Sequence, residues 1–518
     1  MRLRYLRIAD LPPLQSVSVG FGAQHVLERA YALHFVVGVN GSGKTQLLRA
    51  LAQIFLGLER RQLPSFPCTL AYDLGVGSEA RTILVHQPDP EERQDAPSAF
   101  IEFSGVLATR TLAEWEALAW ANWRDDPPLR GQIRGSFLAG DLPGEGAINA
   151  YLPDVLIVYT SGALPRWQAL FARYQRDDAT APLSERSAEG EEVGERPGGW
   201  TTQRENQLQV NNYLQELRTR LERDEEVRLT RGDLTLLEVA QEAAEINRTP
   251  SNAYLIDGDL LPLAVCAVAL AQIVAELHGE TTKEQLQAQI AKARADGVAQ
   301  SGLRRLLNEI DWLWPESLHL RIRFMPEQWQ RGVVERGVVQ EMVDLYKLAT
   351  TAIRQPAPSI ERLLCFDLFR PLKEQGNRLT GLALFERVAK KYGGTPFAAF
   401  RQLVEWRNAG ILLDATLTVR KLGVEDLLVY DWLSDGERMF LGRMALLHLL
   451  KGQNDALIIF DEPETHFNDV WKREIVDIID DNLRQDASEV VISTHSSIAL
   501  SDVFDEEIVL LKRRDGST

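Results

Sequence analysis

The chain has 518 residues, of which 45% are apolar and 25% are charged. These proportions are typical of a soluble globular protein, and the length predicts two to four structural units. The formal net charge is -17, from 57 Lys and Arg against 74 Asp and Glu. A broad nucleic-acid-binding face is usually basic, so this balance does not support nucleic acid as a partner, although a local basic patch would permit it.

Neither a disulfide framework nor a membrane domain is expected. The three cysteines, Cys68, Cys266 and Cys365, lie far apart and form no CxxC pair. The N-terminus lacks the apolar run of a signal peptide. The longest apolar stretch, 260–271, is shorter than the roughly 18 residues of a membrane helix and predicts a buried helix. The sequence therefore predicts a cytoplasmic protein.

The first third of the chain predicts mainly strands. Alternating or continuous apolar runs indicate them at 3–8, 17–19, 33–37, 82–85, 99–103 and 155–159. Between the third and fourth of these, residues 46–55 carry apolar side chains at helical spacing.

The middle of the chain reads differently. Residues 176–206 are rich in Ser, Glu, Gly and Pro, which predicts a mobile acidic loop. Helical spacing dominates 207–310, and 311–405 is mixed but mainly helical. Strands are expected again at 415–419 and 426–430, followed by a strand–helix–strand series from 457 to 511.

The clearest motif is Gly-Val-Asn-Gly-Ser-Gly-Lys-Thr at 38–45, which fits G-x-x-x-x-G-K-[ST]. Glycines let backbone N–H groups close around phosphates, and the following helix N-terminus favours negative charge. Lys44 would reach the β- and γ-phosphates of a nucleotide, and the Thr45 hydroxyl would bind Mg²⁺. A glycine-rich turn that contains a lysine by chance is the alternative, and the preceding strand and following helix disfavour it.

A second motif ends the apolar strand 456–460 with Asp461 and Glu462. Asp461 would hold Mg²⁺ through water, and Glu462 would orient and deprotonate an attacking water. Surface turns also use Asp and Glu, so the pair indicates a nucleotide site only in combination with the phosphate-binding loop.

Two weaker motifs flank this strand. Leu433-Ser434-Asp435-Gly436-Glu437 precedes a helix and predicts either a second anion site or an ordinary N-cap. Downstream, the strand 490–492 runs into Ser493-Thr494-His495-Ser496, where a histidine stands at a strand end. Their order and spacing around Asp461 favour the functional interpretation of both.

Together the four motifs resemble the ABC ATPase superfamily. The text Asp-Glu-Pro-Glu-Thr-His at 461–466 and Ser-Thr-His-Ser at 493–496 is similar to the SMC/RecF/OLD-like branch rather than to transporter ATPases. The resemblance implies an α/β ABC-type P-loop ATPase head, a mixed sheet with flanking helices. It covers 1–162, the N-terminal part of the head, and 411–518, its C-terminal part; the intervening 163–410 predicts an enlarged, mainly helical lobe.

The resemblance also implies roles for the matching positions. Glu462 would be the catalytic base, His495 would sense the γ-phosphate, and Thr45 and Asp461 would hold Mg²⁺. The ATP-binding set would be Gly38, Asn40, Gly41, Ser42, Gly43, Lys44, Thr45, Gln46, Ser434, Gly436 and Glu437.

The same resemblance implies a homodimer that sandwiches ATP. In it the segment 433–437 of each copy, called the signature, would close over the nucleotide bound by the other copy. The loop 464–469, with His466, would lie at that interface. One departure concerns the glutamine that the family usually has after the strand leading into the helical lobe. Here Ser161 or Gln87 would take this role, and the sequence leaves both open.

The enlarged middle and the lack of a recognisable nuclease motif resemble stand-alone ATPase subunits of prokaryotic antiphage systems such as Septu, PARIS and restriction-associated ATPases. The expected function is an Mg²⁺-dependent ATPase that acts as a dimeric sensor and scaffold for a separate effector, a nuclease or a toxin. A RecF-like DNA repair ATPase is the first alternative. A transporter ATPase and a regulatory ATP-binding module that rarely turns over are the others.

Overall fold

The computed structural model describes most of the chain outside 176–251. The described residues are 1–21, 29–89, 98–107, 114–115, 133–138, 142–144, 146–162, 164–175, 252–276, 283–295, 312–323, 345, 349–354, 361–374, 377–380, 395–408, 410–421, 426–465, 469–473, 475–483 and 486–512. The loop predicted at 176–206, the first part (207–251) of the mainly helical stretch predicted at 207–310, and His466 lie outside these residues.

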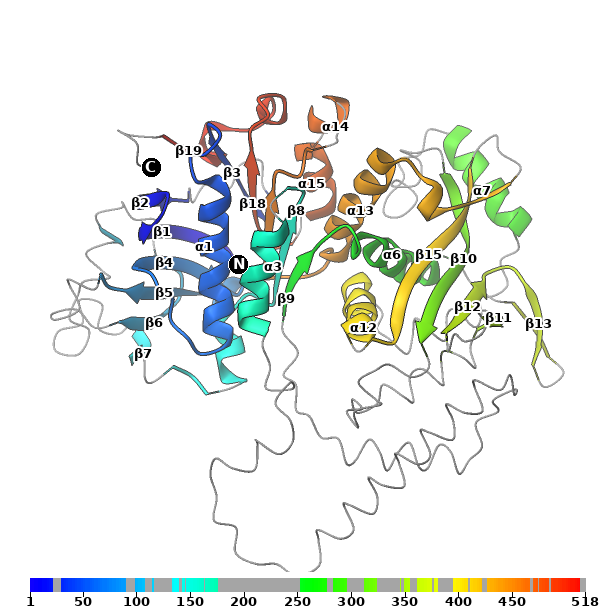
Figure 1. Cartoon of the computed structure of the whole chain (residues 1–518), viewed down its shortest axis with the longest axis horizontal. Coiled ribbons are helices and arrows are strands. Elements are labelled where there is room, and N and C mark those ends of the chain that lie inside the picture. The colour runs from blue at the N-terminus through cyan, green and yellow to red at the C-terminus, as the bar shows by residue number, and fades with distance from the viewer. Residues whose placement is uncertain are drawn as a thin grey trace, which may run out of the picture. The chain divides into compact units, whose positions relative to one another are not determined.

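The chain divides into two compact units (Figure 1). The first contains the described residues of 1–176, 249–257 and 450–518, and the second contains those of 258–449. The predicted boundaries at 162/163 and 410/411 remain a prediction.

A six-stranded parallel sheet forms the centre of the first unit. Its apolar strands are buried, as in parallel sheets covered on both faces. The order across the sheet is β19 (Ile508–Leu511), β3 (Ala32–Gly38), β18 (Glu489–Thr494), β17 (Ala456–Asp461), β8 (Val155–Thr160) and β9 (Ala253–Ile256).

A second, antiparallel sheet belongs to the same unit. Alternation of apolar and polar residues along its first strands matches one buried and one more open face. Its order is β2 (Leu14–Gly20), β1 (Arg2–Leu11), β4 (Cys68–Leu74), β5 (Arg81–Gln87), β6 (Ala99–Ser104) and β7 (Ile133–Leu138).

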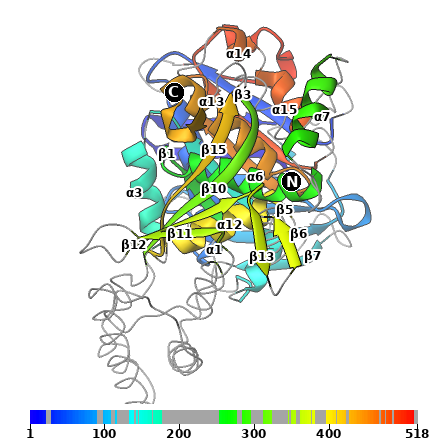
Figure 2. The ribbon, with the colours of Figure 1, turned by 90° about the vertical axis from the view of Figure 1, so that its right-hand side faces the viewer.

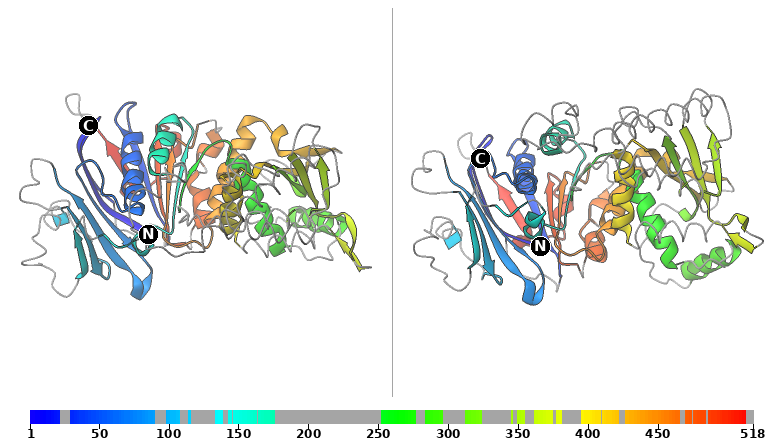
Figure 3. Two further views of the ribbon diagram at one scale, coloured as in Figure 1. Left: turned by 60° about the horizontal axis from the view of Figure 1, so that its bottom comes forward. Right: turned by 90° about the horizontal axis from the view of Figure 1, so that it is seen from below.

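Helix α1 (Lys44–Glu59) lies between these two sheets (Figure 3). Its buried Leu51 belongs to one hydrophobic cluster with Leu70 of the antiparallel sheet and Ile459 of the parallel sheet. The hydrophobic core therefore holds α1 between the two sheets, and this fixes the glycine-rich loop between β3 and α1. The unit's other helices are α3 (Leu164–Gln175), α14 (Asp469–Arg473) and α15 (Ile475–Leu483).

The second unit combines a five-stranded antiparallel sheet with helices (Figure 2). The sheet order is β11 (Thr351–Arg354), β12 (Glu361–Asp367), β10 (Trp312–Arg323), β15 (Leu412–Lys421) and β16 (Leu427–Val429), and β13 (Pro371–Glu374) pairs with β14 (Asn377–Thr380). The helices among the described residues of this unit are α6 (Leu261–Glu276), α7 (Lys283–Ala295), α12 (Pro396–Asn408) and α13 (Asp435–Leu449).

The prediction of a mainly helical lobe is not confirmed, because the described part of this unit is mixed α/β. Leu318, Leu320 and Ile322 of β10 are each about 1% exposed and point to one side of the sheet, as a strand period requires. Helices α12 and α13 both pack on α6. The apolar stretch at 260–271 does form the predicted buried helix, α6.

Short 3-10 turns complete the described secondary structure, at Gly77–Glu79, Ala147–Tyr151, Tyr430–Trp432, Ile498–Leu500 and Asp505–Glu507. Every strand predicted before residue 160 is present, whereas β4, β7 and β9 of the first unit were not predicted. In the described parts of the chain, no helix is both long and apolar enough to cross a lipid bilayer.

Candidate active site

Four neighbouring strands of the parallel sheet end at the same edge, and each carries predicted site residues there. Strand β3 runs into the glycine-rich loop, β17 ends at Asp461, β18 leads to His495, and β8 leads to Ser161. The register places Asp461 beside Ser493 on one side and beside Thr160 on the other. Ligands of open α/β sheets bind at this edge, outside the carboxyl ends of the strands.

Two glycines of the glycine-rich loop lie where a side chain would not fit or would be strained. A Cβ atom on Gly38 would stand 2.5 Å from Ser42 Oγ and 2.9 Å from the Leu511 carbonyl oxygen. Gly43 precedes α1 with φ of 92°, a left-handed conformation that favours glycine. Lys44 is 5% exposed, and its Nζ donates a hydrogen bond to the Gly38 carbonyl oxygen at 2.9 Å.

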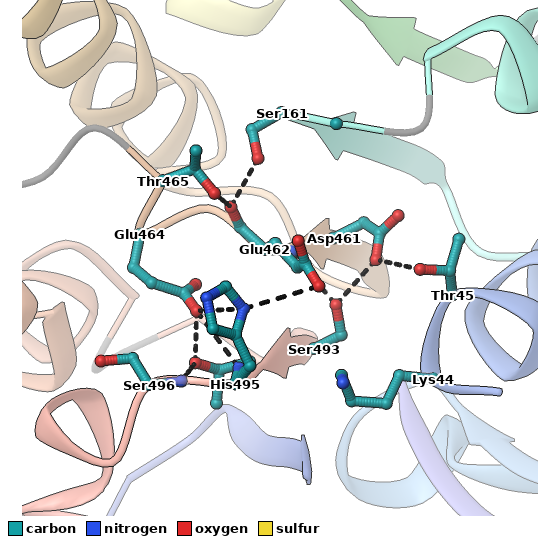
Figure 4. Close-up of polar contacts among 12 residues, drawn as sticks. Lys44, Thr45, Ser161, Asp461, Glu462, Glu464, Thr465, Ser493, His495 and Ser496 are labelled. Atoms are coloured by element: carbon teal, nitrogen blue, oxygen red, sulfur yellow. Dashed lines mark hydrogen bonds and ion pairs between the residues drawn. The ribbon is translucent and has the colours of Figure 1, made fainter. Parts of the chain in front are cut away.

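Asp461 is 2% exposed, and its carboxylate accepts hydrogen bonds on both oxygens, of which Figure 4 shows those from Thr45 and Ser493. Oδ1 accepts from the Thr45 hydroxyl at 3.0 Å and from the Ser493 hydroxyl at 2.7 Å. Oδ2 accepts from Trp167 Nε1 at 3.0 Å and from the Thr160 hydroxyl at 3.4 Å. The structure thus brings together the two residues predicted to hold Mg²⁺.

Glu462 follows in a strained backbone conformation, with φ of 54°. Its amide donates to both the carbonyl and the hydroxyl oxygen of Ser493, each at 3.1 Å. Its carbonyl accepts from Ser161 Oγ at 2.7 Å and from Thr465 Oγ1 at 3.0 Å. These bonds fix the backbone, while the Glu462 side chain stays 33% exposed to solvent.

His495 lies beside two carboxylates. Its Nδ1 is 3.6 Å from Glu462 Oε1 and 3.8 Å from Glu464 Oε1, and the imidazole is half exposed. Glu464 is buried, and its Oε1 accepts hydrogen bonds from the Thr494 hydroxyl and the His495 amide. The two predicted catalytic residues are therefore neighbours, and Glu464 anchors the loop that presents the histidine.

Arg49 of α1 places a positive charge near Asp461. Burial lowers the pKa of Arg49, and the nearby charge of Arg166 lowers it further, whereas Asp461 raises it. Arg49 Nη1 donates to Gln46 Oε1 at 3.0 Å, so the predicted ligand Gln46 has a partner within its own helix.

The signature residues lie in the second unit, at the start of α13. Ser434 Oγ donates to Glu437 Oε2 at 2.8 Å and accepts from the Glu437 amide at 3.3 Å, and the Ser434 amide donates to the same carboxylate at 3.0 Å. This is a reciprocal capping box. The N-cap expected as the alternative is therefore present, and a role for Ser434, Gly436 and Glu437 at a nucleotide remains a prediction.

The two candidates for the family's glutamine differ in their surroundings. Ser161 bonds to the carbonyl of Glu462, at the edge where the site residues meet. Gln87 ends β5 of the antiparallel sheet, where its Oε1 accepts from Ser98 Oγ at 2.8 Å. This geometry favours Ser161.

Two supporting residues were missed by the sequence interpretation. Trp167 lies 294 positions before Asp461, and no motif links them. Ser493 belongs to a recognised motif, but its contact with Asp461 depends on the pairing of β17 with β18. Only the strand register could have indicated that contact.

The residues present fit a nucleotide with Mg²⁺. Ser42 Oγ is buried in the loop and has no hydrogen-bond partner among the described residues. The space beside Gly38 would be closed by any side chain, and Lys44 supplies a buried cation. Thr45 and Asp461 offer a hydroxyl and a carboxylate oxygen, and Mg²⁺ is commonly bound by such oxygens together with substrate phosphates.

Comparison with known proteins gives one family match. Residues 343–502 match the model described as "AAA domain, putative AbiEii toxin, Type IV TA system". This span includes the signature, Asp461, Glu462 and His495, and it is less than a third of the chain. Comparison with curated proteins gives no match.

Several solved structures are similar over the whole chain at low identity. The Smc head domain of Pyrococcus furiosus, with an extended coiled coil and bound to the C-terminal domain of ScpA, is 12% identical, with 100% of this chain and 94% of that chain covered and a TM-score of 0.30. An SmcHead bound to the C-winged helix domain of ScpA is 10% identical, with coverage of 100% and 96% and a TM-score of 0.33. The SMC head domain from Thermotoga maritima is 10% identical, with coverage of 100% and 97% and a TM-score of 0.29. Likenesses this low place no constraint on activity or partners.

The fold of the first unit follows from its own topology. Strand β3, the G-x-x-x-x-G-K-T loop and α1 form the phosphate-binding unit, and β17, separated from β3 by β18, leads into Asp461 and Glu462. The predicted α/β P-loop fold with flanking helices is confirmed by this topology.

Proposed function

We propose that the chain is an Mg²⁺-dependent ATPase that acts as a dimeric sensor and scaffold for a separate effector protein. The observation that carries the ATPase proposal is the hydrogen bond of 3.0 Å between Thr45 and Asp461, with Glu462 and His495 at the same edge. A hydroxyl from the P-loop, a carboxylate at a strand end and a neighbouring base are the set that phosphoryl transfer from ATP to water requires.

Each residue has a defined part in this reaction. Lys44 would exchange its bond to the Gly38 carbonyl for the β- and γ-phosphates. Mg²⁺, held by Thr45, Asp461 and phosphate oxygens, would neutralise negative charge on the phosphates. Glu462 would take the proton of the water that attacks the γ-phosphorus as the bond to ADP breaks. His495 would donate a hydrogen bond to the γ-phosphate.

The dimer and the effector extend the proposal beyond the site. In the dimer, Ser434, Gly436 and Glu437 of one copy would complete the nucleotide site of the other. The description of the matched family model names an AbiEii toxin and a Type IV TA system. This supports a role in prokaryotic defence alongside a toxin or nuclease. ATP would close the dimer, and hydrolysis or nucleotide loss would release or activate the effector.

Two substitutions test the ATPase proposal. Lys44→Ala removes the phosphate-binding cation and should abolish ATP binding, with the exposed Lys451→Ala as its control. Glu462→Gln keeps the side-chain shape but not the base, so it should bind ATP and fail to hydrolyse it. Glu506→Gln, an exposed carboxylate outside the site, should hydrolyse ATP like the unmodified chain. Normal hydrolysis by Glu462→Gln would overturn the assignment of the base.

The effector proposal needs a separate experiment. Glu462→Gln would be expressed with its native neighbouring genes, purified in ATP and Mg²⁺, and analysed for mass and bound proteins. A dimer with a stoichiometric nuclease or toxin is the expected result. Recovery of DNA without such a protein would favour the DNA repair alternative instead.

A further inference from the structure

The side chain of Trp167 contacts the centre of the candidate site from an element that none of the four motifs includes. Trp167 lies near the start of α3, the helix that follows β8 and Ser161. The indole is 0% exposed, and its Nε1 donates to Asp461 Oδ2 at 3.0 Å. A buried N–H in contact with a buried carboxylate is a specific polar contact within an otherwise apolar cluster.

The hydrogen bonds of Asp461 divide between its two oxygens. Oδ1 accepts from Thr45 and Ser493, the first of which belongs to the P-loop. Oδ2 accepts from Trp167, with Thr160 further away at 3.4 Å. The indole N–H can only donate, so it holds Oδ2 as an acceptor and prevents the carboxylate from rotating. Oδ1 then stays directed toward the Thr45 hydroxyl.

We propose that Trp167 is a positioning residue for Mg²⁺: it fixes Asp461 so that Oδ1 is preorganised beside Thr45. This inference rests on the proposed ATPase function, because it assigns Asp461 to the metal side of the site. Residues that orient metal ligands through hydrogen bonds commonly change metal affinity or activity by roughly tenfold to a hundredfold when they are altered.

Trp167 also fills space in the core, so its two contributions must be separated. Trp167→Phe removes the N–H and keeps an aromatic ring. The matched control is Trp115→Phe, which makes the same change at a Trp that is 2% exposed in a different hydrophobic cluster, beside the antiparallel sheet. A purely structural role would make the two variants behave alike.

The experiment measures binding of a fluorescent ATP analogue to the full chain, first in EDTA and then as Mg²⁺ is added. For Trp167→Phe, the half-saturating Mg²⁺ concentration should rise roughly tenfold to a hundredfold. Affinity in EDTA should stay unchanged, and Trp115→Phe should match the unmodified chain in both measurements. Equal Mg²⁺ dependence in all three proteins would overturn the inference.

Two further outcomes are informative. If the unmodified chain binds the analogue without any response to Mg²⁺, the proposed ATPase function fails before Trp167 is tested. If Trp167→Phe does not fold, 3-benzothienylalanine at position 167 replaces the indole N–H by sulfur at nearly the same shape. That protein should show the same rise in half-saturating Mg²⁺, and a dependence equal to that of the unmodified chain would refute the role of the N–H.

Discussion

Replacement of Ser493 by alanine should weaken both the fold and the active site. Ser493 Oγ is fully buried, donates to Asp461 Oδ1 at 2.7 Å and accepts from the Glu462 amide at 3.1 Å. A hydrogen bond to a charged group contributes about 1.5–3 kcal/mol to stability. The Glu462 amide also donates to the Ser493 carbonyl, which the substitution leaves in place, so losing the bond from this amide to Ser493 Oγ adds little to the cost. We therefore expect the free energy of unfolding to fall by about 2 kcal/mol.

The control contacts the same carboxylate over a longer distance. Thr160 Oγ1 lies 3.4 Å from Asp461 Oδ2 and 3.4 Å from the Gly162 amide nitrogen that donates to it. Both distances are beyond the usual hydrogen-bond range, so Thr160→Val should cost less than Ser493→Ala, about 1 kcal/mol. Urea denaturation of both variants, followed by circular dichroism, measures these free energies. Mg²⁺-dependent ATP hydrolysis should fall more in Ser493→Ala than in Thr160→Val. If Thr160→Val lowered the free energy of unfolding as much as Ser493→Ala, the length of a hydrogen bond to Asp461 would not determine how much that bond contributes to stability.

Two further predictions concern acid stability and the P-loop. Burial lowers the pKa of His86 from 6.5 to about 4, so between these pH values the unfolded chain binds more protons at this site than the folded chain. Stability therefore falls as the pH is lowered, and the loss from pH 7.5 to pH 5 should be about 2 kcal/mol. In urea denaturation at both pH values, His86→Gln should lack this part of the loss, and an unchanged pH dependence would contradict it. Gly38→Ala would place Cβ 2.5 Å from Ser42 Oγ and should weaken ATP binding by about 1–3 kcal/mol in a calorimetric titration. Gly162→Ala, which meets nothing within 4 Å, should bind ATP normally, and equal binding by both variants would refute the steric argument.

The active-site motifs could be predicted from the sequence because each is contiguous and stands at the end of an apolar strand. Parallel strands end at one edge of their sheet, so Lys44, Asp461 and His495 had to meet once β3, β17 and β18 were neighbours. Helix α6 was equally predictable, since it is apolar on all sides and long enough to exclude a strand.

The sheet of the second unit could not be predicted in the same way. Strand β10 alternates visibly only over its second half, and its first half contains Trp312, Trp314 and Pro315. Its partners β12 and β15 come much later in the chain. Strand propensity depends on such partners more than helix propensity does, so nearby helical patterns dominated the interpretation. Trp167 was missed for a related reason: its contact with Asp461 joins residues 294 positions apart.

Asp461 and Glu462 are adjacent in the chain, yet the fold places their carboxylates in opposite environments. The Asp461 side chain is buried, and three hydrogen bonds of 2.7–3.0 Å together with a longer contact of 3.4 Å hold its carboxylate in place. At Glu462 the hydrogen bonds are made by the backbone rather than by the side chain. Its φ of 54° departs from the strand conformation of β17, so its side chain does not continue the alternation of that strand. Its carboxylate is one-third exposed beside His495. Two neighbouring acids in unlike surroundings suit two roles, a fixed ligand and a base that exchanges protons with water. The strained backbone at Glu462 is what separates them.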